Sequence, residues 1–349
     1  MPDKPNIIID SGAYSTWKGG GEVDLVGYCD WLIANKDWIG PYVALDVIGP
    51  KDPEAAALGG IKNLEYMLGR GLDPIPVFHA GEDIKYLHRM LDMGCKYIGL
   101  AASMLPSRPE SDAWYDYAWS HLVDRHGDPV VKVHAFGEGR PHCVVRYPWQ
   151  SADSATWLYA AQRNAIIWVS LFDRVGVMQR NDGKGHGHLK DVHSLNDRDR
   201  AVFDDHLRAV GINPELMRAL ETGKQGFLIR TYLAAIPYLA MQKIVRERQP
   251  IRRRAGGLFA PPASRQAIAL DPFNMHLVIG NNTASYVVLA ELEHMNALSS
   301  YYYIAGTKTV GHHSVLRDYC INPKQACMSH PKLAQLWDDL QNTLLKNMV

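Results

Sequence analysis

The sequence lacks any apolar run of the roughly 18 residues that a transmembrane helix needs. No cationic segment followed by an apolar stretch precedes Ile7, so we expect no secretory signal. Cysteines are few, scattered and odd in number, which excludes a disulfide framework and indicates reduced thiols; they are Cys29, Cys95, Cys143, Cys320 and Cys327. These absences predict a cytoplasmic protein without a membrane partner.

Neither sign of charge is in excess, since 37 Lys and Arg balance 37 Asp and Glu. A zero sum gives no overall attraction for nucleic acid, because neutralising phosphates requires Lys and Arg. A local patch can still bind phosphates, and the densest basic stretch ends in a flexible Gly-Gly pair after Arg252, Arg253 and Arg254. These three arginines are our nucleic-acid-binding candidates. The alternative is a solvated surface loop.

Closely spaced zinc ligands are also missing. Structural zinc sites place two cysteines two to four residues apart, whereas Cys320 and Cys327 are further apart. We therefore predict no metal and no other cofactor, although His330 and either His312 or His313 keep a zinc site open as an alternative. A second histidine-rich segment is more typical of a solvated or nucleic-acid-facing loop, and it contains His186, His188 and His193.

The first half of the chain alternates short β-branched runs with amphipathic segments, which is typical of parallel sheets. A doubly wound open sheet would show one Gly-rich first turn, and none is present. We therefore predict an α/β fold of the (β/α)8 TIM barrel type. The expected strands span 6–10, 42–46, 75–79, 96–101 and 130–136, and the expected helices span 24–35, a segment opened by Pro53, 83–93 and 111–124.

The second half is less regular. We expect a sixth strand end leading into a helix within 146–157, a seventh strand at 165–171 and an eighth at 275–280. The sequence pattern predicts helix from about 196 to 248, with interruptions near Gly211 and at Pro237. No linker divides the chain, so we expect a single domain over 1–349. It would carry a helical and basic-loop insertion at about 181–270 and a C-terminal helical extension at about 300–349.

Two strand ends carry carboxylates that are suited to catalysis, Asp10 in IIIDSGAY and Asp153 in SADSATW. Active sites of (β/α)8 barrels lie at the carboxyl ends of the strands. There, one carboxylate can attack a sugar anomeric carbon while the other moves a proton. The alternative for Asp10 is a structural Asp-Ser-Gly turn.

Other strand ends offer contacts to a flat, polar ligand. Asp46 can accept hydrogen bonds from the amide-like edge of guanine, or cap the next helix. His79 can donate to a base carbonyl, and Gly99 allows a close backbone approach, although packing also explains a glycine there. Tyr14 and His134 can enclose a planar base, with core packing as the alternative for Tyr14.

Six segments occur in the order found in the tRNA-guanine transglycosylase superfamily: IDSGAY, ALDVIGP, PVFHAGE, YIGLA, VHAFGEGRP and SADSATW. The last two resemble the archaeal type. The HAFG segment together with Tyr-Pro-Trp-x-Ser-x-Asp-Ser-x-x-Trp is closer still to the DNA 7-deazaguanine transglycosylases of phages and bacterial DNA-modification clusters (DpdA-like). The resemblance covers roughly residues 6–170.

This resemblance implies roles. Asp153 would be the nucleophile that holds the nucleotide covalently, and Asp10 the general acid/base. Asp46 would read the base, with Tyr14 and His134 enclosing it and Gly99 contacting its carbonyl. His79 stands where the tRNA enzymes commonly have Gln. A target guanine would have to be flipped from double-stranded DNA to reach such a pocket.

The expected function is therefore the exchange of guanine in DNA for a 7-deazaguanine base such as preQ0, in a bacterial or phage-infected cytoplasm, with a homodimer as one possible assembly. The closely spaced zinc cysteines of the tRNA enzymes and the C-terminal RNA-binding domain of the archaeal ones do not occur here. A tRNA-guanine transglycosylase is the nearest alternative. A non-catalytic nucleic-acid-binding barrel and a hydrolase that transfers the sugar to water are the others.

Overall fold

The computed structural model describes residues 7–49, 51–102, 105, 107–158, 165–166, 176–178, 189–191, 195–209, 213–215, 224–247, 265–279, 288–290, 301–304, 323–329 and 331–347. The chain divides into two compact units. The first comprises Met1–Ser154, Ile244–Val278 and Ser300–Ser314, and the second comprises Ala155–Lys243, Ile279–Ser299 and Val315–Val349.

The first unit is built on a seven-stranded sheet with the order β1-β10-β9-β5-β4-β3-β2. The β1–β10, β2–β3, β3–β4, β4–β5 and β5–β9 pairs are all parallel. The prediction of an α/β protein with a parallel sheet is therefore confirmed. The strands are β1 (Ile7–Asp10), β2 (Val77–His79), β3 (Tyr97–Ala101), β4 (Lys132–Phe136), β5 (Ser151–Ser154), β9 (Asn274–Ile279) and β10 (Tyr301–Ile304).

The predicted strand at 42–46 forms isolated parallel bridges, Ile9 with Tyr42 and Val43 with Ile75. Val43 N donates to Ile9 O at 2.8 Å, and Ala44 N donates to Ile75 O at 2.8 Å. This segment therefore hydrogen-bonds to β1 on one side and to the residues that lead into β2 on the other.

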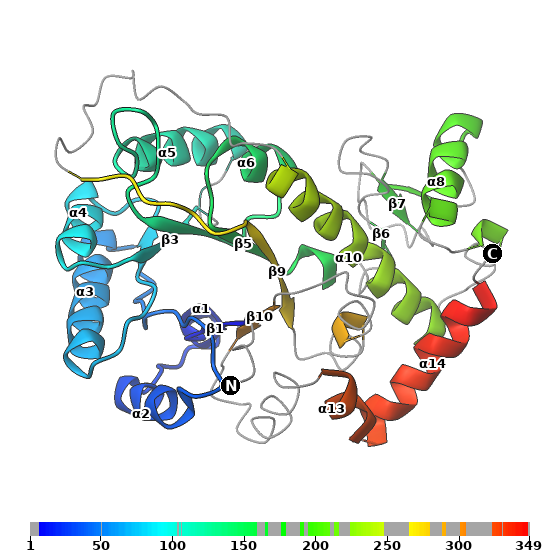
Figure 1. Cartoon of the computed structure of the whole chain (residues 1–349), viewed down its shortest axis with the longest axis horizontal. Helices are drawn as coiled ribbons and strands as arrows, with labels where there is room; N and C mark the ends of the chain where they lie inside the picture. The colour runs from blue at the N-terminus through cyan, green and yellow to red at the C-terminus, as the bar shows by residue number, and fades with distance from the viewer. Residues whose placement is uncertain are drawn as a thin grey trace. The chain divides into compact units, whose positions relative to one another are not determined.

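The helices of this unit begin where the sequence provides caps. Asp24, Asp52 and Asp83 precede α2 (Leu25–Asn35), α3 (Pro53–Gly69) and α4 (Ile84–Asp92), and each carboxylate accepts a backbone N–H of the first turn. Ser107 caps α5 (Arg108–Ser120) in the same way. α1 (Ala13–Lys18) and α6 (Pro141–Arg146) are short. In Figure 1, α2 to α5 follow one another in chain order around the strands.

The core of this unit lies on both faces of the sheet. Ile7, Ile8 and Ile9 are all fully buried although successive strand residues point to opposite faces. β3 and β4 likewise each bury three consecutive residues. Burial on both faces is what a parallel sheet covered by helices requires. Because the strands are parallel, their polar carboxyl ends lie at one edge of the sheet.

The second unit contains a three-stranded sheet of β6 (Ala165–Ile166), β7 (Gly176–Met178) and β8 (Leu189–Asp191). Of the strand predicted at 165–171, the structure describes Ala165 and Ile166, which form β6. Its predicted place in the large sheet is wrong, because β6 pairs antiparallel with β7 and β5 pairs instead with β9. Short apolar runs do not reveal which sheet they join. The described helices of this unit include α8 (Asp197–Ala209), α10 (Lys224–Glu247), α13 (Pro323–Ser329) and α14 (Pro331–Asn347).

Two further expectations in the second half need correction. Helix α10 continues through Pro237, where we expected an interruption. The strand expected at 275–280 is confirmed as β9, but the Tyr301–Ile304 strand that pairs with β1 was not predicted. None of the helices in the described ranges has the length and apolarity to cross a membrane.

Candidate active site

The predicted site residues lie on or beside the strands of the first unit. Asp10 and His79 are the last residues of β1 and β2, and Asp153 is the third of four residues in β5. Asp46 follows the bridged segment at 42–43. Because parallel strands end at the same edge of a sheet, these side chains gather at one edge of the fold.

Asp10 has the most perturbed carboxyl of the group. Burial raises its pKa, the charges of Asp46 and Asp153 raise it further, and hydrogen bonds from the backbone N–H groups of Gly12 and Ser11 partly oppose them. The resulting pKa is about 7. A carboxyl with this pKa can both give and take a proton near neutral pH.

Asp153 is buried and held through one oxygen. Its Oδ1 accepts a hydrogen bond from Gly137 N at 2.8 Å and lies 3.2 Å from His134 Nε2. Gly137 has a φ of 63°, a left-handed conformation that aims its N–H and that other residues adopt with strain. The carboxylate is therefore fixed in orientation by the backbone after β4 and by a ring within β4.

His134 has no exposed surface and lies between two hydrogen-bonding partners. Its Nδ1 is 2.6 Å from Ser151 Oγ, opposite the Nε2 contact to Asp153. Ser151 Oγ is in turn 2.5 Å from the hydroxyl of Tyr97. In this structure the ring of His134 supports Asp153, and its predicted role in enclosing a base remains a prediction.

The imidazole of His79 bridges two carboxylates. Its Nε2 lies 3.0 Å from Asp46 Oδ2, and its Nδ1 lies 3.1 Å from Glu82 Oε1. Burial alone would lower the pKa of His79, but the hydrogen bonds and charges of Asp46 and Glu82 raise it to about 10. His79 is therefore an imidazolium at neutral pH. Both of its N–H groups are engaged with carboxylates, so neither points to a ligand in this conformation.

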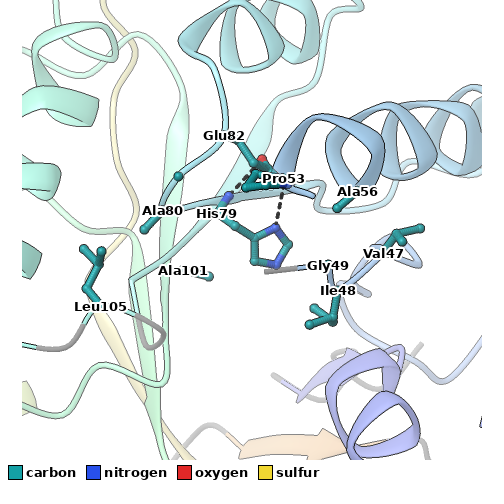
Figure 2. Close-up of a pocket in the computed structure, with 11 residues that line it drawn as sticks. Val47, Ile48, Gly49, Pro53, Ala56, His79, Ala80, Glu82, Ala101 and Leu105 are labelled. Atoms are coloured by element: carbon teal, nitrogen blue, oxygen red, sulfur yellow. Dashed lines mark hydrogen bonds and ion pairs between the residues drawn. The ribbon is translucent and has the colours of Figure 1, made fainter. Parts of the chain in front are cut away.

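A pocket of about 180 Å³ opens beside this ion cluster. Figure 2 shows the His79 ring between Glu82 and the 47–49 segment, with dashed lines from the backbone N and from the ring of His79 to Glu82. Apart from His79 and Glu82 the lining side chains are apolar, so the pocket offers a charged edge and a hydrophobic wall, as small-molecule sites do. The apolar lining includes Val47, Ile48, Pro53, Ala56, Ala80, Ala101 and Leu105.

Gly99 and Tyr14 lie in contrasting surroundings. A Cβ on Gly99 would come within 2.0 Å of Phe136 Cε2, so the glycine leaves room for that ring. Tyr14, on α1, has 49% of its surface exposed, and its ring centre is 5.9 Å from that of Trp17. Packing explains Gly99, whereas Tyr14 is accessible to a ligand.

Several predicted residues lie outside the part of the chain that the structure describes. They are Arg252, Arg253, Arg254, Cys320, His330, His312, His313, His186, His188 and His193. Among the described residues, no group of three or more His, Cys, Asp or Glu side chains is placed to hold a metal ion. The described cysteines Cys29, Cys95, Cys143 and Cys327 are buried and are not paired in disulfides.

The residues that contact the candidate site and were not predicted include Tyr97, Ser151, Glu82 and Gly137. Two of them left a signal in the sequence. Ser151 stands two residues before Asp153 and so shares its face of the strand. Glu82 stands three residues after His79, within reach across a turn.

These contacts hold three carboxylates in different states: Asp10 near its titration point, Asp46 paired with an imidazolium, and Asp153 accepting hydrogen bonds on one oxygen. Carboxyl groups held in such different environments are typical of sites that divide acid and nucleophile roles. Neither a protein-family model nor a curated protein matches the sequence.

Proposed function

We propose that the first unit is a closed (β/α)8 barrel. Its support is the bridged segment at 42–43, which hydrogen-bonds to β1 at one end of the seven-strand order and to Ile75, just before β2, at the other. With this segment placed between β1 and β2, neighbouring strands follow one another in chain order. The β1–β10, β2–β3, β3–β4, β4–β5 and β5–β9 pairs are all parallel. A site at the carboxyl ends of the strands is where barrel enzymes place their chemistry.

On this barrel the proposed activity is that of a nucleic-acid guanine transglycosylase. The observation that carries it is that two different carboxyl groups lie in one site. Asp10 has a pKa of about 7, raised by burial and by the charges of Asp46 and Asp153, and Asp153 is buried and oriented. Glycosyl transfer with a covalent intermediate requires one proton-shuttling carboxyl and one nucleophilic carboxylate. The proposed substrate class comes from the six ordered segments around both residues, which resemble those of guanine transglycosylases.

In the first step, the Asp153 carboxylate attacks C1′ of the target nucleotide. A bond forms between the carboxylate oxygen and C1′, the bond from C1′ to N9 of guanine breaks, and its electron pair passes to the base. The Asp10 carboxyl donates its proton to the departing base, which leaves as neutral guanine. A covalent glycosyl ester on Asp153 remains.

In the second step, the incoming 7-deazaguanine loses its N9 proton to the Asp10 carboxylate. N9 then attacks C1′, and the electron pair of the ester bond returns to Asp153. Asp10 is again protonated and Asp153 is again ionised, so the site is restored. No cofactor is consumed in either step.

Base recognition would use Asp46 and the pocket beside His79. Asp46 Oδ2 faces His79, and its Oδ1 receives, from the described part of the chain, one contact of 3.4 Å from the Ser11 hydroxyl. Oδ1 can therefore accept an N–H from the amide-like edge of guanine. The apolar wall would cover the plane of the ring. Tyr14, exposed on α1, would close over the base from solvent.

DNA is the proposed polymer because the HAFG and SADSATW segments resemble the DNA-modifying branch. The experiment is incorporation of a labelled 7-deazaguanine, preQ0, into duplex DNA and into tRNA by the purified chain. Labelling of DNA supports the proposal. Labelling of tRNA alone would assign the tRNA reaction. Release of guanine without incorporation would assign a hydrolase, and no reaction with either polymer would favour a non-catalytic subunit.

A further inference from the structure

We propose that Tyr97, Ser151 and His134 form a buried hydrogen-bond chain that positions Asp153 and leaves its Oδ2 as the oxygen that attacks C1′. The choice of attacking atom rests on the function proposed above, whereas the hydrogen-bond chain itself does not. Tyr97 lies on β3, Ser151 on β5 and His134 on β4, and the other two side chains both contact Ser151.

The contacts of Asp153 fall on one of its two oxygens. Gly137 N, at 2.8 Å, and His134 Nε2, at 3.2 Å, both contact Oδ1. A carboxylate oxygen has two lone pairs in its plane, and two N–H donors engage both. Hydrogen bonding withdraws electron density from Oδ1, so Oδ2 is the more available nucleophile.

The hydrogen-bond donors of the chain all face the same way. Oδ1 of Asp153 accepts from Gly137 N, and a carboxylate can only accept, so His134 Nε2 is its second donor; in the Nε2–H tautomer, Nδ1 is left as an acceptor. Ser151 Oγ–H then donates to Nδ1 over 2.6 Å, and Ser151 Oγ accepts the Tyr97 hydroxyl over 2.5 Å. Burial raises the pKa of Tyr97, which keeps that phenol a donor. Every donor in the chain therefore points toward Asp153.

The strand register builds this arrangement. His134 pairs with Ser151 across the β4–β5 ladder, and Ser151 and Asp153 are two residues apart on one face of β5. A ring on the neighbouring strand can therefore contact both. Fixing the imidazole tautomer through its second nitrogen is the way in which many enzymes hold a histidine that supports a reacting group.

Serine, histidine and aspartate, the residue types of Ser151, His134 and Asp153, also occur together in serine hydrolases, where serine is the nucleophile. Here Ser151 is 1% exposed and His134 is fully buried. Ser151 Oγ also has two partners already. Ser151 and His134 are therefore positioning residues for Asp153.

The kinetic experiment compares Ser151→Ala and Tyr97→Phe with wild type in single-turnover formation of the covalent protein–DNA adduct. We expect S151A to lower the rate of adduct formation about 10–100-fold, as loss of a supporting shell does elsewhere, with DNA affinity unchanged within about threefold. Y97F should lower it less. The matched control is Ser111→Ala, which removes a buried hydroxyl bonded to the Ser107 carbonyl in α5 and should stay within about twofold.

A second measurement does not depend on activity. Nitrogen NMR of ¹⁵N-histidine-labelled protein, with the His134 signals assigned by their loss in His134→Asn, reports which ring nitrogen is protonated. We expect the Nε2–H tautomer in wild type and in S111A, and a mixed tautomer in S151A. The Nδ1–H tautomer in wild type, or an unchanged tautomer and rate of adduct formation in S151A, would contradict the proposed hydrogen-bond chain.

The two measurements separate the two proposals. If wild type forms no adduct, the proposed function fails, and the NMR result alone decides whether the chain exists. If the adduct forms, a crystal structure of it should show the sugar on Oδ2 of Asp153. A sugar on Oδ1 would overturn the choice of attacking atom.

Discussion

Nε2 of His79 lies 3.0 Å from Oδ2 of Asp46, so the aspartate expected to read a base is already paired with a cation. Glu82 holds the other ring nitrogen at 3.1 Å. Asp46 also acts on Asp10, because its charge and that of Asp153 push Asp10 toward its protonated form.

Replacing His79 with Gln should destabilise the protein, because two largely buried carboxylates would lose their cation. We expect the free energy of unfolding in urea at pH 7 to fall by about 2–4 kcal/mol, in line with buried pairs that lose one partner. The pKa of His79 is raised to about 10. Its stabilisation is therefore complete below its ordinary pKa of 6.5 and is lost as pH rises through about 10.

The matched control for this change is His126→Gln, at an exposed histidine in the turn after α5, which should change stability by less than about 0.5 kcal/mol. Equal stability of H79Q and wild type at pH 7 would show that the ion cluster does not form.

Replacing Asp10 with Asn should stabilise the protein in alkaline solution. The pKa is about 7 in the folded protein and near 3.8 in the unfolded chain, so between these values only the folded state binds the proton. Stability contributed by this group therefore decreases as pH rises from about 4 to about 7. At pH 8, D10N should unfold with a free energy roughly 2–4 kcal/mol above that of wild type, and the gain should vanish near pH 4.

Urea denaturation of D10N and wild type at pH 4, 6 and 8 measures this difference. Asp37→Asn, an exposed carboxylate after α2, is the matched control and should show no such trend. A gain in D10N that is the same at all three pH values would contradict the buried-carboxyl account.

Replacing Gly99 with Ala should be destabilising because the new Cβ would lie 2.0 Å from Phe136 Cε2. We expect a loss of about 1–3 kcal/mol, as for other overpacked cores. Gly69→Ala is the control, since nothing lies within 4 Å of a Cβ there. In the Phe136→Leu background the cost of G99A should shrink, and equal costs in both backgrounds would mean that the ring does not fill this space.

Much of the first unit follows from local signals. Aspartates before α2, α3 and α4 mark the helix starts, and the β-branched runs before Asp10 and His79 mark strand ends. The positions of the candidate carboxylates follow from the same pattern, because a parallel sheet brings strand ends together.

The contacts within the site do not follow from local pattern. The Ser151–His134 and Asp46–His79 pairs depend on which strands are neighbours and in which register, and no single segment contains that information. The failure at 165–171 has the same origin, since an apolar run predicts a strand but not its sheet. Gly99 was ambiguous for a related reason, because its neighbour Phe136 lies on the adjacent strand.

The proposed attack of Asp153 on the nucleotide can be tested directly. The measurement is a denaturing gel, with intact-mass analysis, of protein incubated with guanine-containing duplex DNA and quenched before the second base is added. Wild type should give a denaturation-resistant adduct at the mass of protein plus DNA less one guanine, and Asp153→Asn should give none. An adduct that persists in D153N, or its absence in a wild-type protein that still exchanges bases, would contradict the claim.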